Sequence, residues 1–261
     1  MSPIRLGAVS YLNTKPLVYG LEARADLFDI RFDVPAQCAR LLHDGLVDLG
    51  LIPAIEYQRD DYAIVPGVAI GSRGPIASVA LFTRVPIERV RTLALDISSR
   101  TSVALTRILC AKLWDIAPTF TPAEPKVDAM LAAADAALII GDNALWLDPA
   151  AHDAAKVDLG EAWHALTGLP FVYAVWAGRT GAVTPAHVDA LNEARDRGLA
   201  AAEAIGAAEG GDAGRARQVV AYLRDNLRYG LGEAEVEGLS RFHHLAAEIG
   251  LVPALRPLRF Y

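Results

Sequence analysis

The stretch IRLGAVSYLNTKP, residues 4–16, carries the local signals that decide the fold. Its first part, Ile4–Val9, is a short apolar run that predicts a buried strand. A polar turn follows, and we expect a helix from about Thr14 to Ala23, with Pro16 tolerated in its first turn. A strand that leads through a turn into a helix is typical of the opening of an α/β fold.

The same alternation continues along the chain as far as Trp176. Strands alternating with helices predict mainly parallel sheets flanked by helices. Two strand-rich blocks of similar size, Ile4–Thr83 and Thr92–Trp176, indicate two sheets and therefore two lobes. We expect lobe 1 to comprise residues 1–84 and 177–261, lobe 2 to comprise residues 85–176, and a ligand cleft to lie between them.

Beyond Pro185 the pattern becomes almost wholly helical, with Gly-rich breaks. The expected helices are Pro185–Ile205, Asp212–Leu227 and Gly232–Ile249, and we expect them to pack on lobe 1. Their apolar faces could cover the core or a dimer interface, so the pattern leaves a homodimer open.

The bulk composition excludes several classes of protein. The chain has 261 residues, a net charge of −6 and no Lys/Arg run, which argues against a nucleic-acid partner. No stretch approaches the ~20 apolar residues of a membrane span. The N-terminal residues lack the pattern of an export signal, so a cytoplasmic protein is expected. Cys38 and Cys110 lie in helix-like apolar patterns and predict buried, reduced thiols.

The first candidate ligand loop follows the first strand, because ligands of such sheets bind beyond the carboxyl ends of the strands. Ser10, Tyr11 and Asn13 offer hydroxyl and amide groups at the start of the expected helix. A helix start favours a carboxylate, and Asn13 could orient a substrate hydroxyl. The alternative is that Asn13 or Thr14 only caps the helix.

The loop after Thr92–Asp96 is the strongest candidate anion site. Ser99, Arg100, Thr101 and Ser102 gather hydroxyl groups and a guanidinium where a helix is expected to begin. The Gly-rich spacing and Lys of a phosphate loop are absent. An ordinary helix cap, with Arg100 in solvent, is the alternative.

Two further loops could contribute to the cleft. Ser72 and Gly74 lie in a turn where glycines allow a close approach of the backbone to a ligand, and Ser78 opens the next strand. Gly141 and Asp142 follow an apolar strand, and Asp142 could act as a general acid or base. The alternatives are a plain crossover turn and an N-cap aspartate.

Histidine is absent from all of these loops. We also find no Cys/His cluster with metal-ligand spacing, no Gly-x-Ser-x-Gly elbow and no dinucleotide fingerprint. No metal and no cofactor are therefore expected, and a nucleophile paired with a histidine is poorly supported.

The motifs in combination resemble the chorismate dehydratases of the futalosine route to menaquinone. The resemblance covers nearly the whole chain and is carried by Val9–Leu17, Asp48–Tyr57, Ile70–Pro75, Ser78, Ser99–Ser102, Ile140–Asp142, Leu166–Phe171, Tyr222–Asn226 and Gly230–Gly232. It implies a type II periplasmic-binding-protein fold that closes on chorismate, which loses water to give 3-[(1-carboxyvinyl)oxy]benzoate.

The resemblance also implies roles for the loops. We expect Asn13 to orient the reacting part of chorismate, Ser78 and the Gly71–Gly74 turn to contact one carboxylate or the ether, and Ser99, Thr101 and Ser102 to receive a carboxylate. The base is either the enolpyruvyl carboxylate of the substrate or Asp142. Two rival functions remain: the sister enzyme that makes 1,4-dihydroxy-6-naphthoate, which is expected to use a cleft histidine, and a non-catalytic small-anion-binding protein.

Overall fold

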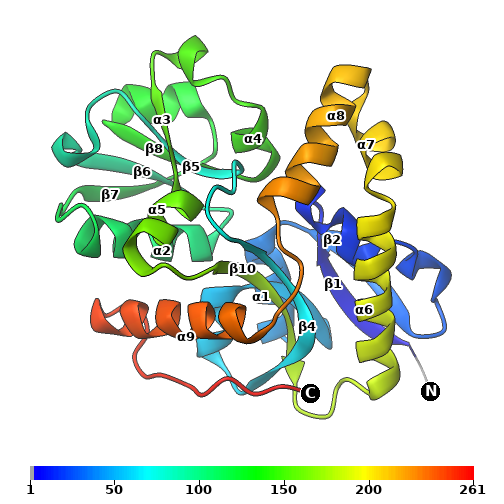
Figure 1. The fold of residues 1–261 in the computed structure, drawn as a ribbon. Coiled ribbons are helices and arrows are strands. Elements are labelled where there is room, and N and C mark those ends of the chain that lie inside the picture. Colours follow the sequence, from blue (N-terminus) through cyan, green and yellow to red (C-terminus); the bar gives the residue numbers. More distant parts are fainter. Residues whose placement is uncertain (1–2) are drawn as a thin grey trace.

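The first lobe is built on a five-stranded sheet in the order β2-β1-β3-β10-β4 (Figure 1). The structure, a computed structural model, describes residues 3–261, so Met1 and Ser2, with which the predicted lobe 1 begins, lie outside the described residues. The strands are β1 Ile4–Val9, β2 Phe28–Asp33, β3 Leu49–Pro53, β4 Tyr62–Ser72 and β10 Phe171–Arg179. Between them lie the 3₁₀ helices η1 Leu12–Val18, η2 Leu21–Ala23 and η3 Ala54–Arg59, and the α-helix α1 Pro35–His43.

The second lobe is built on a five-stranded sheet in the order β7-β6-β8-β5-β9. Its strands are β5 Val79–Thr83, β6 Thr92–Asp96, β7 Thr119–Ala123, β8 Ala136–Ile140 and β9 Ala155–Asp158. Its helices are η4 Ile87–Arg89, α2 Arg100–Lys112, α3 Val127–Ala133, α4 Gly141–Trp146, η5 Pro149–His152 and α5 Leu159–Thr167. The two-lobed α/β architecture predicted from the alternating pattern is therefore confirmed.

Both sheets are mixed rather than mainly parallel, which corrects the prediction. In each sheet two strand pairings are parallel and two are antiparallel. The antiparallel pairings involve β10 in the first sheet and β5 in the second. β5 directly follows the first crossing between the lobes and β10 directly follows the second. Each of them runs antiparallel to both of its neighbouring strands.

Because of the same two strands, the boundaries between the lobes differ from the predicted ones. β5 belongs to the second sheet and β10 to the first, so the chain crosses between the sheets after Ser72 and again before Phe171. The predicted boundaries at residues 84 and 177 fall beyond these strands. Apolar strands of similar composition give no signal of which sheet they join, because both faces of each sheet are covered.

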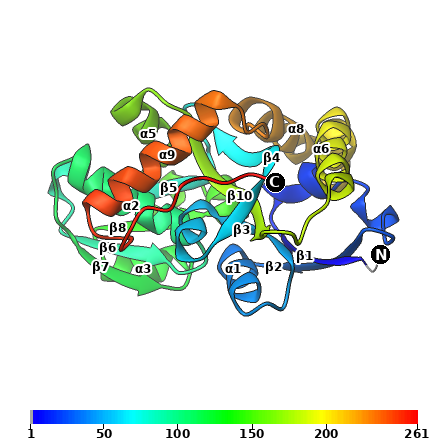
Figure 2. The same ribbon diagram turned by 90° about the horizontal axis from the view of Figure 1, so that it is seen from below.

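The C-terminal region forms a layer of helices over the first lobe that also reaches the second. It consists of α6 Pro185–Ala200, α7 Ala202–Gly210, α8 Ala213–Ala221, the π-helical turn η6 Tyr222–Asn226, and α9 Glu233–Glu248. α6 packs on η1 and β4, whereas α9 packs on β10 and also on α2 of the second lobe (Figure 2). The predicted packing of these helices on lobe 1 is therefore present, and the homodimer stays an open prediction.

One expected helix, Thr14–Ala23, is replaced by the two short 3₁₀ helices η1 and η2. Pro16 lies inside η1, where its missing N–H interrupts helical hydrogen bonding. Gly20, with φ of 76°, then breaks the chain between the two segments. The turn that carries Asn13 therefore leads into a 3₁₀ segment and not into an α-helix.

An aromatic cluster fills the junction between the lobes. Phe171 on β10 packs edge-on against Trp163, Phe242 and Tyr173, with ring centroids 5.0, 5.0 and 4.7 Å apart. The indole of Trp163 also donates to the carbonyl oxygen of Pro170 (3.1 Å). Such pairs add to the stabilisation from burial, so the cluster fixes α5 and α9 against the strand that leads back into lobe 1.

Both cysteines are buried and free, as predicted. Cys38 lies in α1 and Cys110 in α2, and burial raises the pKa of each thiol to about 12. No helix within residues 3–261 combines the length and apolar character needed to cross a membrane. In the same part of the chain no three His, Cys, Asp or Glu side chains are grouped in a way that would hold a metal ion.

Candidate functional site

A small cavity lies between the lobes at the carboxyl ends of the parallel strands, with a volume of about 50 Å³. Six of the predicted site residues line it: Tyr11, Asn13, Ser78, Ser99, Ser102 and Gly141. Pro35, Pro53, Tyr173 and Ala174 also line it and had not been predicted. None of the described residues around this cavity is charged, and none is a histidine.

The other predicted residues lie beside the cavity and do not line it. Ser10 is exposed, whereas the hydroxyl of Ser72 is buried and donates to the carbonyl oxygen of Gly74 (3.1 Å) in the crossover turn. Thr101 accepts a hydrogen bond from the backbone N–H of Ile55 (3.3 Å). Arg100 and Asp142 likewise make contacts across the lobes.

Ser78 is held by a tyrosine from the C-terminal region. The phenol of Tyr222, in the π-helical turn, donates to the Ser78 hydroxyl at 2.7 Å, and both side chains are almost wholly buried. Burial raises the pKa of Tyr222 well above its usual range, an effect that hydrogen bonds with Ser78 and Asn13 partly offset. Because Ser78 accepts from Tyr222, its own hydroxyl hydrogen is free to point into the cavity.

A strained turn brings Ser78 to the cavity. Ala77, directly before it, has φ of 65°, a conformation that non-glycine residues rarely adopt. The carboxylate of Asp158 holds this turn by accepting from the backbone N–H groups of Ala77 (2.7 Å) and Ile76 (3.1 Å). Strain of this kind persists only where the surroundings impose it, and it is found mainly at functional sites.

The turn that carries Asn13 is fixed from two sides. Tyr229 donates from its hydroxyl to the backbone oxygen of Asn13 (2.9 Å). From the second lobe, the carboxylate of Asp142 accepts from the backbone N–H of Leu12 (3.2 and 3.4 Å). Burial raises the pKa of Asp142. The Asp142 side chain therefore joins the lobes instead of facing the cavity.

A second contact between the lobes involves Tyr11, whose ring packs directly on Gly141. A Cβ at Gly141 would lie 3.0 Å from two ring carbons of Tyr11, and the φ of this glycine is 63°. The Tyr11 hydroxyl donates to Ser98 (3.4 Å), which in turn donates to the carboxylate of Asp96 (2.6 Å). Asp96 is fully buried and its Oδ2 atom has no partner within residues 3–261. Burial raises its pKa.

The start of α2 presents two linked hydroxyl groups. Ser99 is the N-cap, and its Oγ accepts from the backbone N–H of Ser102 (3.3 Å). The same oxygen donates to the Ser102 hydroxyl at 2.9 Å, which leaves the hydrogen of Ser102 for a further acceptor. The predicted cap and the predicted anion site therefore coincide, since the capping side chains also line the cavity.

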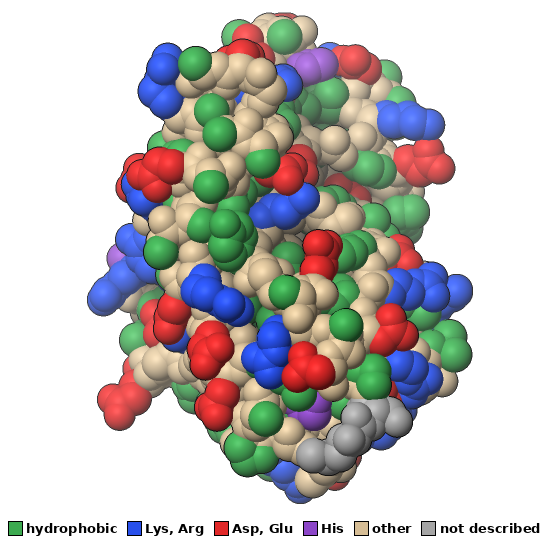
Figure 3. Space-filling view, turned by 90° about the vertical axis from the view of Figure 1, so that its right-hand side faces the viewer, with side chains coloured by type: hydrophobic (Ala, Val, Ile, Leu, Met, Phe, Trp, Pro, Cys, Tyr) green, Lys and Arg blue, Asp and Glu red, His purple; other side chains and the backbone are tan. Residues whose placement is uncertain are grey.

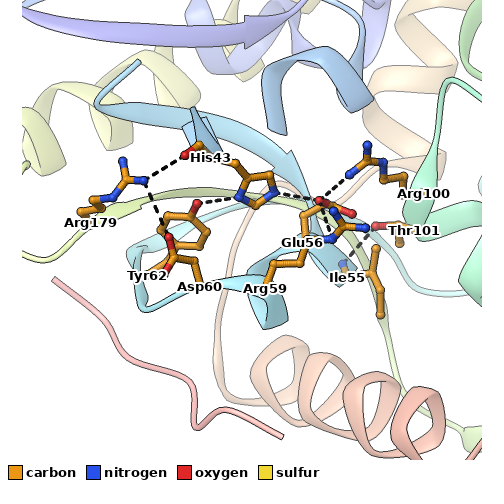
Figure 4. A network of polar contacts seen from close by, with 9 residues as sticks. All are labelled: His43, Ile55, Glu56, Arg59, Asp60, Tyr62, Arg100, Thr101 and Arg179. Atoms are coloured by element: carbon orange, nitrogen blue, oxygen red, sulfur yellow. Dashed lines mark hydrogen bonds and ion pairs between the residues drawn. The ribbon is translucent and has the colours of Figure 1, made fainter. Parts of the chain in front are cut away.

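A third contact between the lobes is centred on Glu56, which is 2% exposed (Figure 4). Its carboxylate accepts from Arg100 (2.8 Å) of the second lobe and from Arg59 (3.2 Å) and His43 (2.8 Å) of the first. His43 also bonds to the hydroxyl of Tyr62 (2.7 Å). Arg100, predicted as a ligand contact, therefore serves in this arrangement to join the lobes.

Charged side chains on the face over α6 are of both signs and interspersed (Figure 3). Lys15 on η1 pairs with Glu209 of α7 at 2.7 Å. That face carries no continuous basic patch of the kind that binds nucleic acid.

Comparisons with known proteins identify the family and the fold of the chain. A family model described as menaquinone biosynthesis matches residues 4–248. The chain is 32% identical to the chorismate dehydratase of Thermus thermophilus, over 93% of this chain and 94% of the relative. Among solved structures, a protein from Archaeoglobus fulgidus matches with a TM-score of 0.73 at 18% identity, over 96% of this chain and 99% of that one. The periplasmic aliphatic sulphonate binding protein of Escherichia coli matches with a TM-score of 0.67 at 19% identity, over 100% and 94%.

Proposed function

The chain belongs to the menaquinone biosynthesis family, and on that premise we propose that it is a chorismate dehydratase. The reaction removes the ring hydrogen on the carbon that bears the enolpyruvyl ether and the hydroxyl on the next carbon. The electrons of the broken C–H bond form the last double bond of an aromatic ring, and the hydroxyl leaves with a proton as water. The product is 3-[(1-carboxyvinyl)oxy]benzoate.

The observation that carries this proposal is the neutral lining of the cleft cavity. Asn13, Ser78, Ser99 and Ser102 supply amide and hydroxyl groups, and no described residue around the cavity supplies a strong base. Formation of an aromatic ring provides the driving force, so orientation of the substrate matters more than a powerful base. A hydrolase or transferase that depends on a histidine or an activated nucleophile would need groups that this lining lacks.

We assign the carboxylates of chorismate to neutral donors. The hydroxyl of Ser102 and the start of α2 would receive one carboxylate, because a helix start favours negative charge. Ser78, whose hydrogen is freed by the bond from Tyr222, would donate to the other carboxylate or to the ether oxygen. Asn13 would orient the departing hydroxyl, since its amide can both donate and accept.

The base in this proposal is the enolpyruvyl carboxylate of the substrate. Asp142, the protein-borne alternative, is bonded to the backbone N–H of Leu12 and does not line the cavity. A carboxylate held inside the same molecule as the proton has a high effective concentration, so it needs no pKa adjustment by the protein. Its position would be set by Asn13 and Ser78.

In the described conformation the cleft is too narrow to hold chorismate. Pockets for small molecules are usually ~300 Å³ or larger, whereas the cleft cavity measures about 50 Å³. Chorismate would enter when the lobes separate, which requires the contacts Asp142–Leu12, Tyr11–Ser98 and Glu56–Arg100 to break. Their reformation would exclude water from the reacting ring.

The finer setting of the reaction also belongs to this proposal. We assign the activity to the futalosine route of menaquinone biosynthesis and to the cytoplasm, and the two buried free thiols suit a reducing compartment. A small molecule, not a nucleic acid or a membrane, would be the partner of the cleft.

Incubation of the purified protein with chorismate tests the function directly. Loss of the diene absorbance together with appearance of the benzoate spectrum is expected, and Asn13→Ala should abolish most of the turnover. Tight binding of chorismate without conversion would identify an anion-binding protein and would refute the proposal. Unchanged turnover by Asn13→Ala would remove Asn13 from the chemistry.

A further inference from the structure

A second cavity lies outside the cleft, between η3, the outer side of α2 and the C-terminal segment 251–256. Its volume is about 1040 Å³, at the upper end of the range found for small-molecule pockets. Among residues 3–261, Ser99 alone lines both cavities. The reaction proposed above makes no use of this second cavity.

The lining of this cavity is strongly positive although the whole chain is negative. Four arginines, Arg59, Arg100, Arg107 and Arg256, face it together with a single carboxylate, Glu56. The chain as a whole has a net charge of −6, so the concentration of positive charge here is local. A concave, partly apolar site of one sign attracts ligands of the opposite sign.

Glu56 cannot neutralise the whole set. It is already bonded to Arg100, Arg59 and His43, as Figure 4 shows. Arg256, from the C-terminal segment, bonds through Nε to the backbone oxygen of Gln58 (3.3 Å).

Arg107 is the one of these four arginines that stacks on an aromatic ring. Its guanidinium lies over the ring of Phe120, 4.7 Å from the centroid. Its Nε atom is shielded from water and has no hydrogen-bond partner within residues 3–261. The shielded Nε atom is out of reach of a ligand, but the residue lines the cavity, and a guanidinium held by stacking loses little freedom when a carboxylate binds to it.

The remaining walls are apolar and open to the cavity. Ile97 is 56% exposed and Leu255 is 42% exposed, although both are large apolar side chains that are usually buried. Leu95, Val252 and Pro122 line the cavity beside them. The cavity therefore offers an apolar surface wide enough for a ring system next to a cationic group.

We propose that this cavity binds an amphipathic organic acid, with its carboxylate on Arg107 and its ring system against Ile97 and Leu255. The ligand of this cavity would be separate from the substrate in the cleft, because Ser99 is the one described residue that lines both cavities. Charge selects the acid, and the apolar walls select a ligand with a broad hydrocarbon body.

Calorimetric titration of the full chain with 2-naphthoate tests the proposal, with neutral 2-naphthalenemethanol as the charge control. Saturable binding of the acid is expected, with the alcohol bound at least about tenfold more weakly, since a charge-assisted hydrogen bond is lost. Arg107→Met removes the guanidinium that lies over Phe120 but keeps a long unbranched side chain, and it should weaken naphthoate binding about tenfold. The matched control is Arg89→Met, an exposed arginine of η4, which should bind normally.

Two results would overturn the proposal: absence of saturable binding, and equal affinity of Arg107→Met and the unaltered chain for naphthoate. Thermal unfolding and chorismate turnover report whether Arg107→Met is folded. If it is not, Leu255→Asp is the second variant; it introduces a negative charge into the lining of the cavity and should abolish naphthoate binding while leaving turnover intact.

Discussion

Replacement of Asp142 tests whether this residue joins the two lobes or acts as the catalytic base. Its carboxylate accepts from the backbone N–H of Leu12 at 3.2 and 3.4 Å, and hydrogen bonds to charged groups contribute about 1.5–3 kcal/mol. Asp142→Ala removes that acceptor, so kcat/KM for chorismate should fall by about 10- to 100-fold, mainly through KM. Asp142→Asn keeps an acceptor oxygen, so turnover should stay within about threefold of normal.

A base would give the opposite pattern. Loss of a general base lowers kcat by about 10²- to 10⁴-fold whichever residue replaces it, because neither amide nor methyl can take the proton. Steady-state kinetics on chorismate, read as kcat and KM separately, distinguish the two cases. A comparable collapse of kcat in Asp142→Asn and Asp142→Ala would refute the joining role. The neighbouring Asn143→Ala is the matched control, because Asn143 is exposed and its change should alter neither constant.

Three further substitutions test the cleft and its support. Tyr222→Phe removes the bond to Ser78 and should lower kcat/KM about tenfold, with no further loss when it is added to Ser78→Ala; additive losses in this double-mutant cycle would contradict it. Asp96→Asn should make the free energy of urea unfolding less dependent on pH. Burial raises the pKa of Asp96 in the folded state, so the unaltered chain loses stability as pH rises above about 3.8 towards that raised pKa. The same dependence of unfolding free energy on pH in both proteins would contradict this. Gly198→Ala should destabilise by about 1–3 kcal/mol in urea unfolding, because its Cβ would meet the backbone of η1, whereas Gly230→Ala meets open space and should cost little; equal effects would contradict the packing argument.

Short-range patterns account for what the sequence predicted well. The strand at Ile4–Val9 and the helix that starts at Arg100 both depend on neighbours within a few residues, and both are present. The hydroxyl-rich turns at Asn13 and Ser99 were found because such groups gather after strands of an α/β sheet, and the fold brings both turns to one cavity.

Contacts distant in sequence account for what was missed. Tyr222 lies 144 residues from the serine that it bonds, and no local pattern marks a phenol for that role. For Asp142 the sequence suggested an N-cap or a base and not a contact between lobes, because its partner Leu12 lies 130 residues away. Arg100 was expected at a ligand, yet its partner Glu56 could be recognised only after the lobes were placed together.

The position of β10 has a consequence for synthesis on the ribosome. β10 lies between β3 and β4 and pairs with both, so the sheet of lobe 1 lacks an inner strand until residue 179 has been made. The sheet of lobe 2 uses only residues 79–158, an unbroken segment that is complete earlier. Domains generally fold as units while the chain emerges. The lobe inserted into the middle of the sequence is therefore expected to fold before the lobe with which the sequence begins.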